Sequence, residues 1–209
     1  MRCVTVVQYV IIAVLGLFLA SCGPSPYIAF TEAEGIKSTY GDPKLSGLNE
    51  KYRAELKDIY ARYRQAGIGV YKEGVGFAKL SDKDGNDYYY LMVLVRPAEI
   101  NFDVNTTTPE QRLSTVLKRH FEPNLRYLKA DSLAKDDLDG LAFGVYWPVR
   151  DFKECNHSGG FLEYVVAYLK KSDVIALLNR NLSFKEAIRE AEIVSSQSLK
   201  EPVPIRLVD

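Results

Sequence analysis

The sequence is poor in the side chains that most often perform chemistry, with two histidines and three cysteines among its 209 residues. It also lacks a G-x-S-x-G, a phosphate-binding loop, an H-E-x-x-H and a redox C-x-x-C motif. Its 27 basic and 27 acidic side chains cancel, whereas nucleic-acid-binding proteins usually carry a basic surface. The sequence therefore gives no signature of a common enzyme family, and we expect no nucleic-acid partner, no cofactor and no metal site.

Long hydrophobic runs are also missing. The apolar run near the N-terminus extends from Tyr9 to Ala20, which is short of the roughly 20 apolar residues of a membrane-spanning helix. Arg2 precedes this run and small residues follow it, and that order is typical of an export signal. A cleaved signal peptide over residues 1–21 is therefore favoured over a permanent single-pass anchor.

The end of this segment, Leu19-Ala20-Ser21-Cys22, resembles the lipobox of bacterial lipoproteins. The resemblance covers residues 1–22 only and implies that a peptidase cuts before Cys22, whose thiol carries a lipid that attaches the protein to a membrane. Gly23 stands where an Asp would resemble an inner-membrane retention signal, which points to the outer membrane. We therefore expect a lipid-anchored protein of the cell envelope that faces the periplasm. An ordinary cleaved signal beside an unmodified cysteine is the alternative.

Glycine and proline recur after Cys22 up to residue 46 without a sustained hydrophobic period, which is typical of a linker. We expect residues 22–46 to form a tether between the lipid and the domain, although the apolar stretch Tyr27-Ile28-Ala29-Phe30 could dock on the domain instead. The remaining residues, 47–209, are numerous enough to bury a core of their own.

Hydrophobic periodicity predicts that this domain is α+β. Apolar side chains recur every three or four residues from Leu48 to Tyr63 and favour a helix, while Thr108 and Ser183 each begin a capping box. Because a lone hairpin is unstable in water, we expect two hairpins to join in one antiparallel sheet with helices packed on it. The predicted helices are 48–66, 108–121, 125–138 and 183–194, and the predicted strands are 68–80, 88–95, 141–149 and 161–169.

The order of these elements repeats at a shift of 75 residues. Ile68-Gly69-Val70-Tyr71 then falls on Phe143-Gly144-Val145-Tyr146, Gly85 falls on Gly160, and Thr108 falls on Ser183. This alignment predicts an internal duplication of a helix-strand-strand-helix unit, with copies at 48–121 and 123–195. Two similar units without a common origin are the alternative.

Three groups of polar residues are candidates for a site. Cys155 and His157 are close enough in sequence for a thiolate–imidazolium pair or part of a metal site, but an incidental pair in a hairpin loop is the simpler interpretation. Asp82–Asp87 spaces its carboxylates like a calcium loop but lacks Gly at the sixth position, so a hairpin turn is favoured. His120 lies on the apolar face of a helix, where we expect packing rather than catalysis.

Tyrosine is abundant in the predicted strands. Its amphipathic ring would suit a platform for a glycan or a peptide, but packing in the core against the tyrosines of the first helix is the interpretation that we favour. The residues concerned are Tyr88, Tyr90, Tyr146, Tyr164 and Tyr168.

These observations predict a lipid-anchored envelope protein whose domain binds or positions an envelope protein or a cell-wall partner without catalysis. Two alternatives remain open. The first is a small periplasmic hydrolase or thiol enzyme centred on Cys155 and His157, which would require both side chains to converge in a cleft. The second is a carrier of an apolar ligand, which would require a large apolar cavity between the sheet and the helices.

Overall fold

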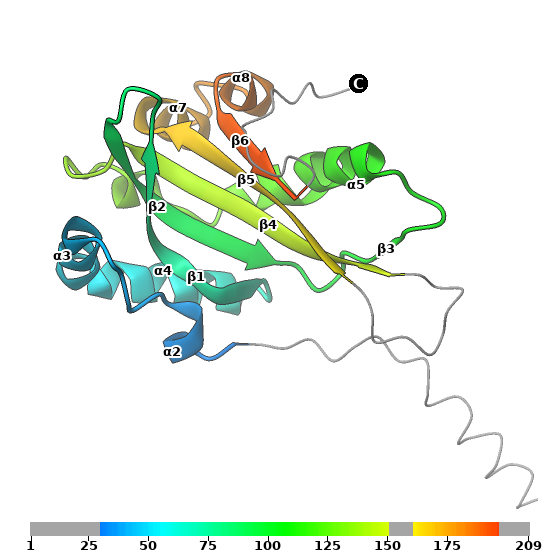
Figure 1. Ribbon diagram of the computed structural model, residues 1–209, viewed down its shortest axis with the longest axis horizontal. Coiled ribbons are helices and arrows are strands. Elements are labelled where there is room, and N and C mark those ends of the chain that lie inside the picture. The colour runs from blue at the N-terminus through cyan, green and yellow to red at the C-terminus, as the bar shows by residue number, and fades with distance from the viewer. Residues whose placement is uncertain (1–29, 151–160, 197–209) are drawn as a thin grey trace, which may run out of the picture.

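The computed structural model describes residues 30–150 and 161–196, which form an α+β domain of two layers (Figure 1). One layer is a six-stranded sheet, and helices packed on one face of that sheet form the other. The helical segments are α2 (Glu32–Gly35), α3 (Pro43–Lys51), α4 (Arg53–Gln65), α5 (Pro109–Val116), the π-helical turn η1 (Leu117–Phe121), α6 (Glu122–Leu125), the 3₁₀ turn η2 (Ala130–Ser132), α7 (Lys171–Leu178) and α8 (Phe184–Arg189). The strands are β1 (Gly69–Ser81), β2 (Asp87–Arg96), β3 (Phe102–Asp103), β4 (Gly140–Arg150), β5 (Phe161–Lys170) and β6 (Glu192–Ser195).

The sheet has the order β1-β2-β4-β5-β6, and β3 pairs with the end of β4. The β1–β2 and β4–β5 pairs are antiparallel, as predicted, and β6 lies antiparallel to β5. However, β2 and β4 are parallel, with Tyr90 opposite Gly140 and Val95 opposite Val145. The prediction of a purely antiparallel sheet is therefore wrong at this junction. Parallel neighbours need a long crossover connection, which residues 97–139 supply through the helical layer.

Odd-numbered residues of β2, β4 and β5 point toward the helices, and we call this side of the sheet the covered face. Phe143 lies at its centre, where its ring contacts Tyr63 of α4 at a centroid distance of 6.5 Å and Phe121 of η1 at 4.8 Å. Phe184 of α8 packs on Phe121 in turn, at 5.8 Å. Two helical segments thus contact Phe143 directly and a third packs behind Phe121, so the core lies between the helices and the sheet. Its fully buried strand residues include Val93, Val95, Leu141, Phe143, Val145, Trp147, Val149, Val165 and Ala167.

The segment from residue 30 to residue 46 belongs to the domain, which corrects the expectation that all of residues 22–46 form a tether. Ile36 is buried in the core and pairs with Val75 at the edge of β1. The Tyr60 hydroxyl donates a hydrogen bond of 2.6 Å to the carbonyl oxygen of Phe30. Apolar burial therefore holds the chain on the domain from Phe30 onward, whereas Cys22 lies outside the described residues.

The helices begin where capping residues predict and end elsewhere. Thr108 and Ser183 both form capping boxes, as predicted. The predicted helix 48–66 is instead two helices that meet at Tyr52. Pro123 does not end the helix that starts after Thr108, because the π-helical turn η1 precedes it and relieves the clash of the proline ring with the preceding turn. Beyond Leu125, which ends α6, the predicted helix 125–138 contains only η2, and the residues predicted to continue α8 form β6.

The arrangement of the sheet argues against the internal duplication. A shift of 75 residues places Leu91 and Val93, which point to the covered face, on Val166 and Tyr168, which point to the opposite face. Because alternate residues of a strand point to opposite sides, this shift inverts the second strand of the unit, although Tyr71 and Tyr146 of the first strands share one side. Gly160 lies outside the described residues.

Candidate functional site

The even-numbered residues of the strands form the second side of the sheet, which we call the open face. Most of its large side chains are only half-buried, and Leu162 and Tyr88 are 39% and 38% exposed. This face therefore presents an extended apolar surface that is not part of the core. Its members include Tyr88, Tyr90, Met92, Leu94, Tyr146, Pro148, Leu162, Tyr164, Val166, Tyr168 and Val194.

Small residues in the central strand make this face flat. Gly140, Ala142 and Gly144 of β4 lie between larger side chains of β2 and β5. A Cβ atom on Gly144 would lie 2.7 Å from the Cδ2 atom of Leu94 and 2.9 Å from the Cγ2 atom of Val166. The side chains from the two flanking strands therefore close over β4 and leave no furrow along it.

A row of stacked aromatic rings crosses one end of the open face. The ring centroids of Tyr71 and Tyr146 are 4.2 Å apart with an interplanar angle of 13°, and those of Tyr146 and Tyr164 are 5.3 Å apart at 24°. Phe30 extends the row to the edge of the sheet with an edge-on contact to Tyr71 at 6.2 Å. Both faces of the Tyr146 ring are thus covered by its neighbours, and burial raises the pKa of its hydroxyl to about 12. We call these four residues the aromatic row.

A bulge in β1 brings Tyr71 into the aromatic row. The register between β1 and β2 shifts between Val70 and Val75, and Glu73 takes a left-handed conformation with φ of 52°. Gly74 permits the bulge because a Cβ there would lie 2.5 Å from the carbonyl oxygen of Leu94. The bulge changes which side of the sheet the following residues face, so Tyr71 reaches Tyr146 while Val75 and Phe77 reach the core.

The strand tyrosines named in the sequence lie on the open face, and the prediction that they pack against the tyrosines of the first helix is wrong. Tyr90 contacts Tyr168 edge-on at 5.2 Å, and Tyr146 stacks on Tyr164. The tyrosines that do meet the helices are others, such as Tyr89 and the helical Tyr63. The open face thus carries the aromatic platform that sequence reasoning considered and set aside.

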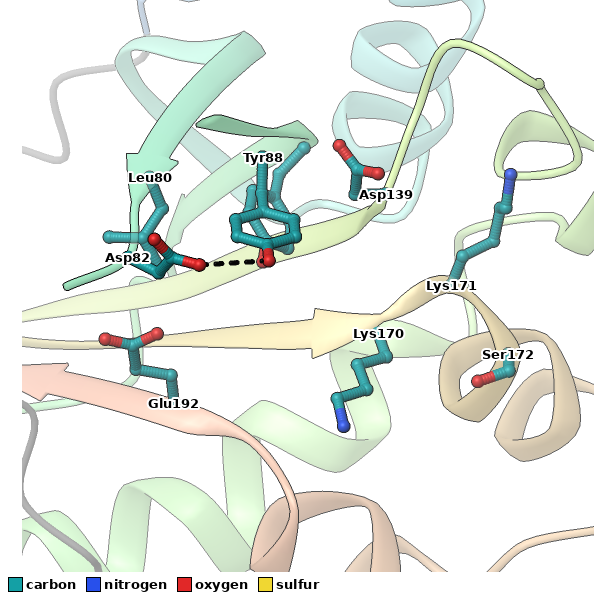
Figure 2. Close-up of a pocket in the computed structure, with 9 residues that line it drawn as sticks. Leu80, Asp82, Tyr88, Asp139, Lys170, Lys171, Ser172 and Glu192 are labelled. Carbon is teal, nitrogen blue, oxygen red and sulfur yellow. Dashed lines mark hydrogen bonds between the residues drawn. The ribbon is translucent and has the colours of Figure 1, made fainter. Parts of the chain in front are cut away.

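A pocket of about 500 Å³ opens at the end of the open face that lies away from the aromatic row, and we call it the end pocket. Figure 2 shows that its walls come from the β1–β2 turn, the start of β4, the end of β5 with the start of α7, and the start of β6. Its lining residues are Leu80, Asp82, Tyr88, Tyr90, Asp139, Lys170, Lys171, Ser172 and Glu192.

Asp82 organises the β1–β2 turn next to this pocket. Its carboxylate accepts hydrogen bonds from the backbone N–H groups of Asp84 and Asn86, from the Asn86 amide and from the Tyr88 hydroxyl. These hydrogen bonds hold the pKa of Asp82 below its usual value, with the Asn86 side chain making the largest contribution. Gly85 has a φ of 83°, as a tight turn requires. The segment Asp82–Asp87 is a hairpin turn, as predicted.

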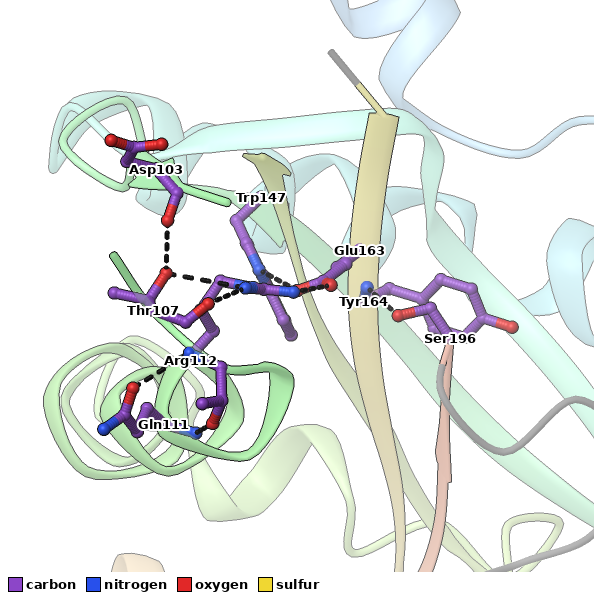
Figure 3. Close-up of polar contacts among 9 residues, drawn as sticks. Asp103, Thr107, Gln111, Arg112, Trp147, Glu163, Tyr164 and Ser196 are labelled. Atoms are coloured by element: carbon purple, nitrogen blue, oxygen red, sulfur yellow. Dashed lines mark hydrogen bonds and ion pairs between the residues drawn. The ribbon is translucent and has the colours of Figure 1, made fainter. Parts of the chain in front are cut away.

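A buried polar network lies on the covered face near the opposite end of the sheet (Figure 3). The Arg112 guanidinium of α5 donates to both carboxylate oxygens of Glu163, at 2.9 and 2.6 Å, and to the Thr107 carbonyl oxygen. The Trp147 indole N–H donates a third hydrogen bond to Glu163, at 2.9 Å. The side chains of Arg112 and Glu163 are only 3% and 5% exposed. Since their hydrogen-bonding capacity is already used, we assign this network to fixing α5 on the sheet.

Sequence reasoning missed this network. The signal for it is Glu163 itself, a charged residue in the inward series of an otherwise apolar strand. A buried carboxylate needs a partner, and Arg112 stands on the apolar side of the helix that begins after Thr108.

The other residues named from the sequence do not form a site among the described residues. His120 is 16% exposed at its side chain and its Nδ1 atom lies 3.5 Å from a carboxylate oxygen of Glu99. Burial lowers the pKa of His120, as expected for a packed histidine. Cys155 and His157 lie outside the described residues. Within the described ranges, no three His, Cys, Asp or Glu residues cluster as a metal would require.

Comparisons with known proteins give no relative. No known protein family matches the chain, no curated protein is similar to it, and no solved structure resembles it. Among residues 30–150 and 161–196, no helix combines the length and the apolar character of a membrane span.

Proposed function

We propose that the protein is a lipid-anchored binding protein of the cell envelope, attached through Cys22 and facing the periplasm. Its domain binds a protein partner through the open face and performs no chemistry. The observation that carries the proposal is the aromatic row with the apolar residues beside it, a surface that the helical layer leaves uncovered in the described ranges.

The geometry of the aromatic row favours a protein over a glycan as the partner. A sugar ring stacks on the flat side of an aromatic ring, but the neighbouring rings already cover both sides of Tyr146. The row instead presents ring edges and hydroxyl groups. Tyrosine is enriched in protein–protein interfaces because it offers apolar area together with a hydrogen-bonding tip.

The carrier alternative has less support. Between the helices and the sheet, Tyr52, Leu56, Phe77 and Leu91 border a void that is too small to hold a water molecule. The core around it is closely packed and leaves no place there for an apolar ligand. The enzyme alternative depends on Cys155 and His157, which lie outside the described residues.

The lipid anchor is tested by the substitution Cys22→Ala. We expect the variant to leave the membrane fraction or to keep its signal segment, whereas the wild-type protein stays with membranes after a high-salt wash. Mass spectrometry of the mature wild-type N-terminus should show an acylated cysteine. An intact residue 1 or an unmodified Cys22 in the mature protein would exclude this anchor.

The binding surface is tested with a photoreactive amino acid placed in living cells at Tyr164 or Met92 of the open face. Arg119, which is exposed on η1 in the helical layer, is the matched control position. We expect both open-face positions to give the same crosslinked partner, and we expect Leu94→Arg to abolish that product while the protein remains folded. Products of equal yield from Arg119, or none from the open face, would contradict the proposed function.

A further inference from the structure

The end pocket combines aromatic and aliphatic walls with carboxylates. Tyr88, Tyr90 and Leu80 supply the apolar walls, while Asp82, Asp139 and Glu192 supply negative charge. A volume of about 500 Å³ is within the range of small-ligand sites. Such a combination suits a cation on an apolar stem, because an aromatic ring attracts a cation over its flat side and a carboxylate supplies the counter-charge.

The Tyr90 hydroxyl is an unused polar group at this pocket. Tyr90 is only 9% exposed and lines the pocket, yet its hydroxyl makes no hydrogen bond within the described residues. The hydroxyl oxygen itself is not sealed from solvent, so a ligand in the pocket can reach it. Burial raises the pKa of Tyr90 to about 12, and the negative charges of Asp139 and Glu192 act in the same direction. Tyr90 therefore offers a neutral hydroxyl whose lone pairs can accept a hydrogen bond from a ligand.

The two lysines of the lining hold their ammonium groups away from the Tyr88 ring. Lys171 donates a hydrogen bond of 2.9 Å to the carbonyl oxygen of Lys135, outside the pocket. Figure 2 shows the Lys170 and Lys171 side chains pointing in opposite directions, both away from the Tyr88 ring. Glu192, by contrast, is exposed and has no ion-pair partner among the described residues, so its carboxylate remains available.

We propose that the end pocket binds a primary ammonium group carried on an aliphatic stem, as in a lysine side chain or an aliphatic diamine. The stem lies against Leu80 and the ring of Tyr88, and the ammonium donates hydrogen bonds to Glu192 and to the Tyr90 hydroxyl. The proposal rests on the proposed function, because the pocket is continuous with the open face and would receive a basic side chain of a partner bound there.

The test measures binding of cadaverine to the purified protein by the chemical shifts of the backbone amides. Glutarate and pentanediol, which have the same chain length with negative charge or none, are the comparison ligands. We expect cadaverine to shift the resonances of Tyr88, Tyr90 and Glu192, and we expect added salt to weaken its binding. Lysine blocked at both its amino and carboxyl ends distinguishes the sources, since only a pocket open to a protein side chain accepts it.

Two variants identify the contacts. Glu192→Gln should weaken cadaverine binding by about fivefold, the upper end of the range for an exposed ion pair. Tyr90→Phe should weaken it by about threefold through loss of one neutral hydrogen bond. Glu190→Gln is the control for the charge change, because Glu190 is exposed after α8, does not line the pocket and pairs with Arg189.

Three results would overturn the proposal: binding of glutarate in preference to cadaverine, equal binding of pentanediol, or an effect of Glu192→Gln no larger than that of Glu190→Gln. Its failure is separable from failure of the proposed function. If the open-face crosslinks persist while cadaverine does not bind, only the pocket assignment falls. If cadaverine binds while the crosslinks are absent, only the protein-binding function falls.

Discussion

The covered face and the open face are built from the same strands but differ in the size and the burial of their central side chains. On the covered face, β4 presents Leu141, Phe143, Val145 and Trp147, and every one of these side chains is fully buried. On the open face the same strand presents Gly140, Ala142 and Gly144, and larger residues from β2 and β5 meet above them. Bulk at the centre of a face fills a core, whereas small residues at the centre leave a flat surface for another molecule.

Polar groups follow the same division. Glu163 on the covered face accepts three hydrogen bonds from Arg112 and Trp147. The hydroxyl of Tyr90 on the open face accepts none from the described residues. A fully satisfied polar group stabilises a fold, whereas an unsatisfied one at a surface pocket is available to a ligand. The comparison therefore predicts that substitutions on the covered face change stability and that those on the open face change binding.

The largest effect is expected from removing a ring at the centre of the core. Phe143→Ala should lower the free energy of unfolding by about 3–5 kcal/mol, since it removes a buried ring and leaves a cavity. Tyr164→Ala, the matched change on the open face, should cost about 1 kcal/mol because its ring is half-exposed. Urea unfolding of both variants measures the difference. Equal losses would mean that the open face is core in solution.

The buried ion pair should show the next largest effect. Arg112→Ala leaves the Glu163 carboxylate buried with only Trp147 as a partner, and we expect a loss of about 3 kcal/mol. Arg189→Ala, which breaks an exposed pair with Glu190, should change the stability by less than about 0.5 kcal/mol. A loss for Arg112→Ala as small as that for Arg189→Ala would show that the network is not needed to hold α5.

Alanine substitutions at two glycines should have smaller effects on stability, and these effects should have opposite signs. Gly144→Ala places a Cβ close to Leu94 and Val166, so we expect a loss of about 2 kcal/mol as both side chains shift. Gly47→Ala, in α3 with nothing within 4 Å of the new Cβ, should gain about 0.5–1 kcal/mol from helix propensity. Thermal unfolding measures both. A Gly144→Ala variant as stable as the wild type would mean that the open face adapts freely.

The smallest effect concerns His120. Burial lowers its pKa in the folded state, so the unfolded chain binds a proton at a higher pH than the folded one. Stability is therefore complete above the unfolded pKa of about 6.5 and is lost as the pH falls through the folded value. His120→Asn should reduce the difference in unfolding free energy between pH 5 and pH 7.5 by less than about 1 kcal/mol. An increased difference would reverse the sign of this argument.

Local patterns in the sequence predicted the elements better than their arrangement. Thr108 and Ser183 identified two helix starts because a capping box involves only four neighbouring residues. The parallel contact of β2 with β4 depends on the crossover of residues 97–139, which no local pattern encodes. The α+β class and the two hairpins are confirmed, while the roles of Cys22, Cys155 and His157 stay predictions.

The open face could have been found from the sequence with one further comparison. Both residue series of β4 are apolar, so alternation alone did not reveal which one faces the helices. Side-chain size does separate them in the first part of the strand, since the odd series is bulky and the even series begins with Gly140, Ala142 and Gly144. The tyrosines of β5 also lie in the even series, with Tyr168 opposite the small Ala142 and Tyr164 opposite Tyr146. The end pocket had no such signal, because its residues come from five separate segments of the sequence.

The hydrogen bond between the Tyr60 hydroxyl and the Phe30 carbonyl oxygen fixes residue 30 on the domain. It therefore determines how far the domain can move from a lipid anchor at Cys22. With Cys22 lipidated as proposed, only eight residues connect the lipid to this fixed point, and a chain of that length spans at most about 28 Å. A linker this short keeps the domain in a thin layer above the membrane. The effective concentration of a partner in the same membrane then reaches the millimolar range. An interaction too weak to survive dilution in free solution would then be occupied at the membrane surface.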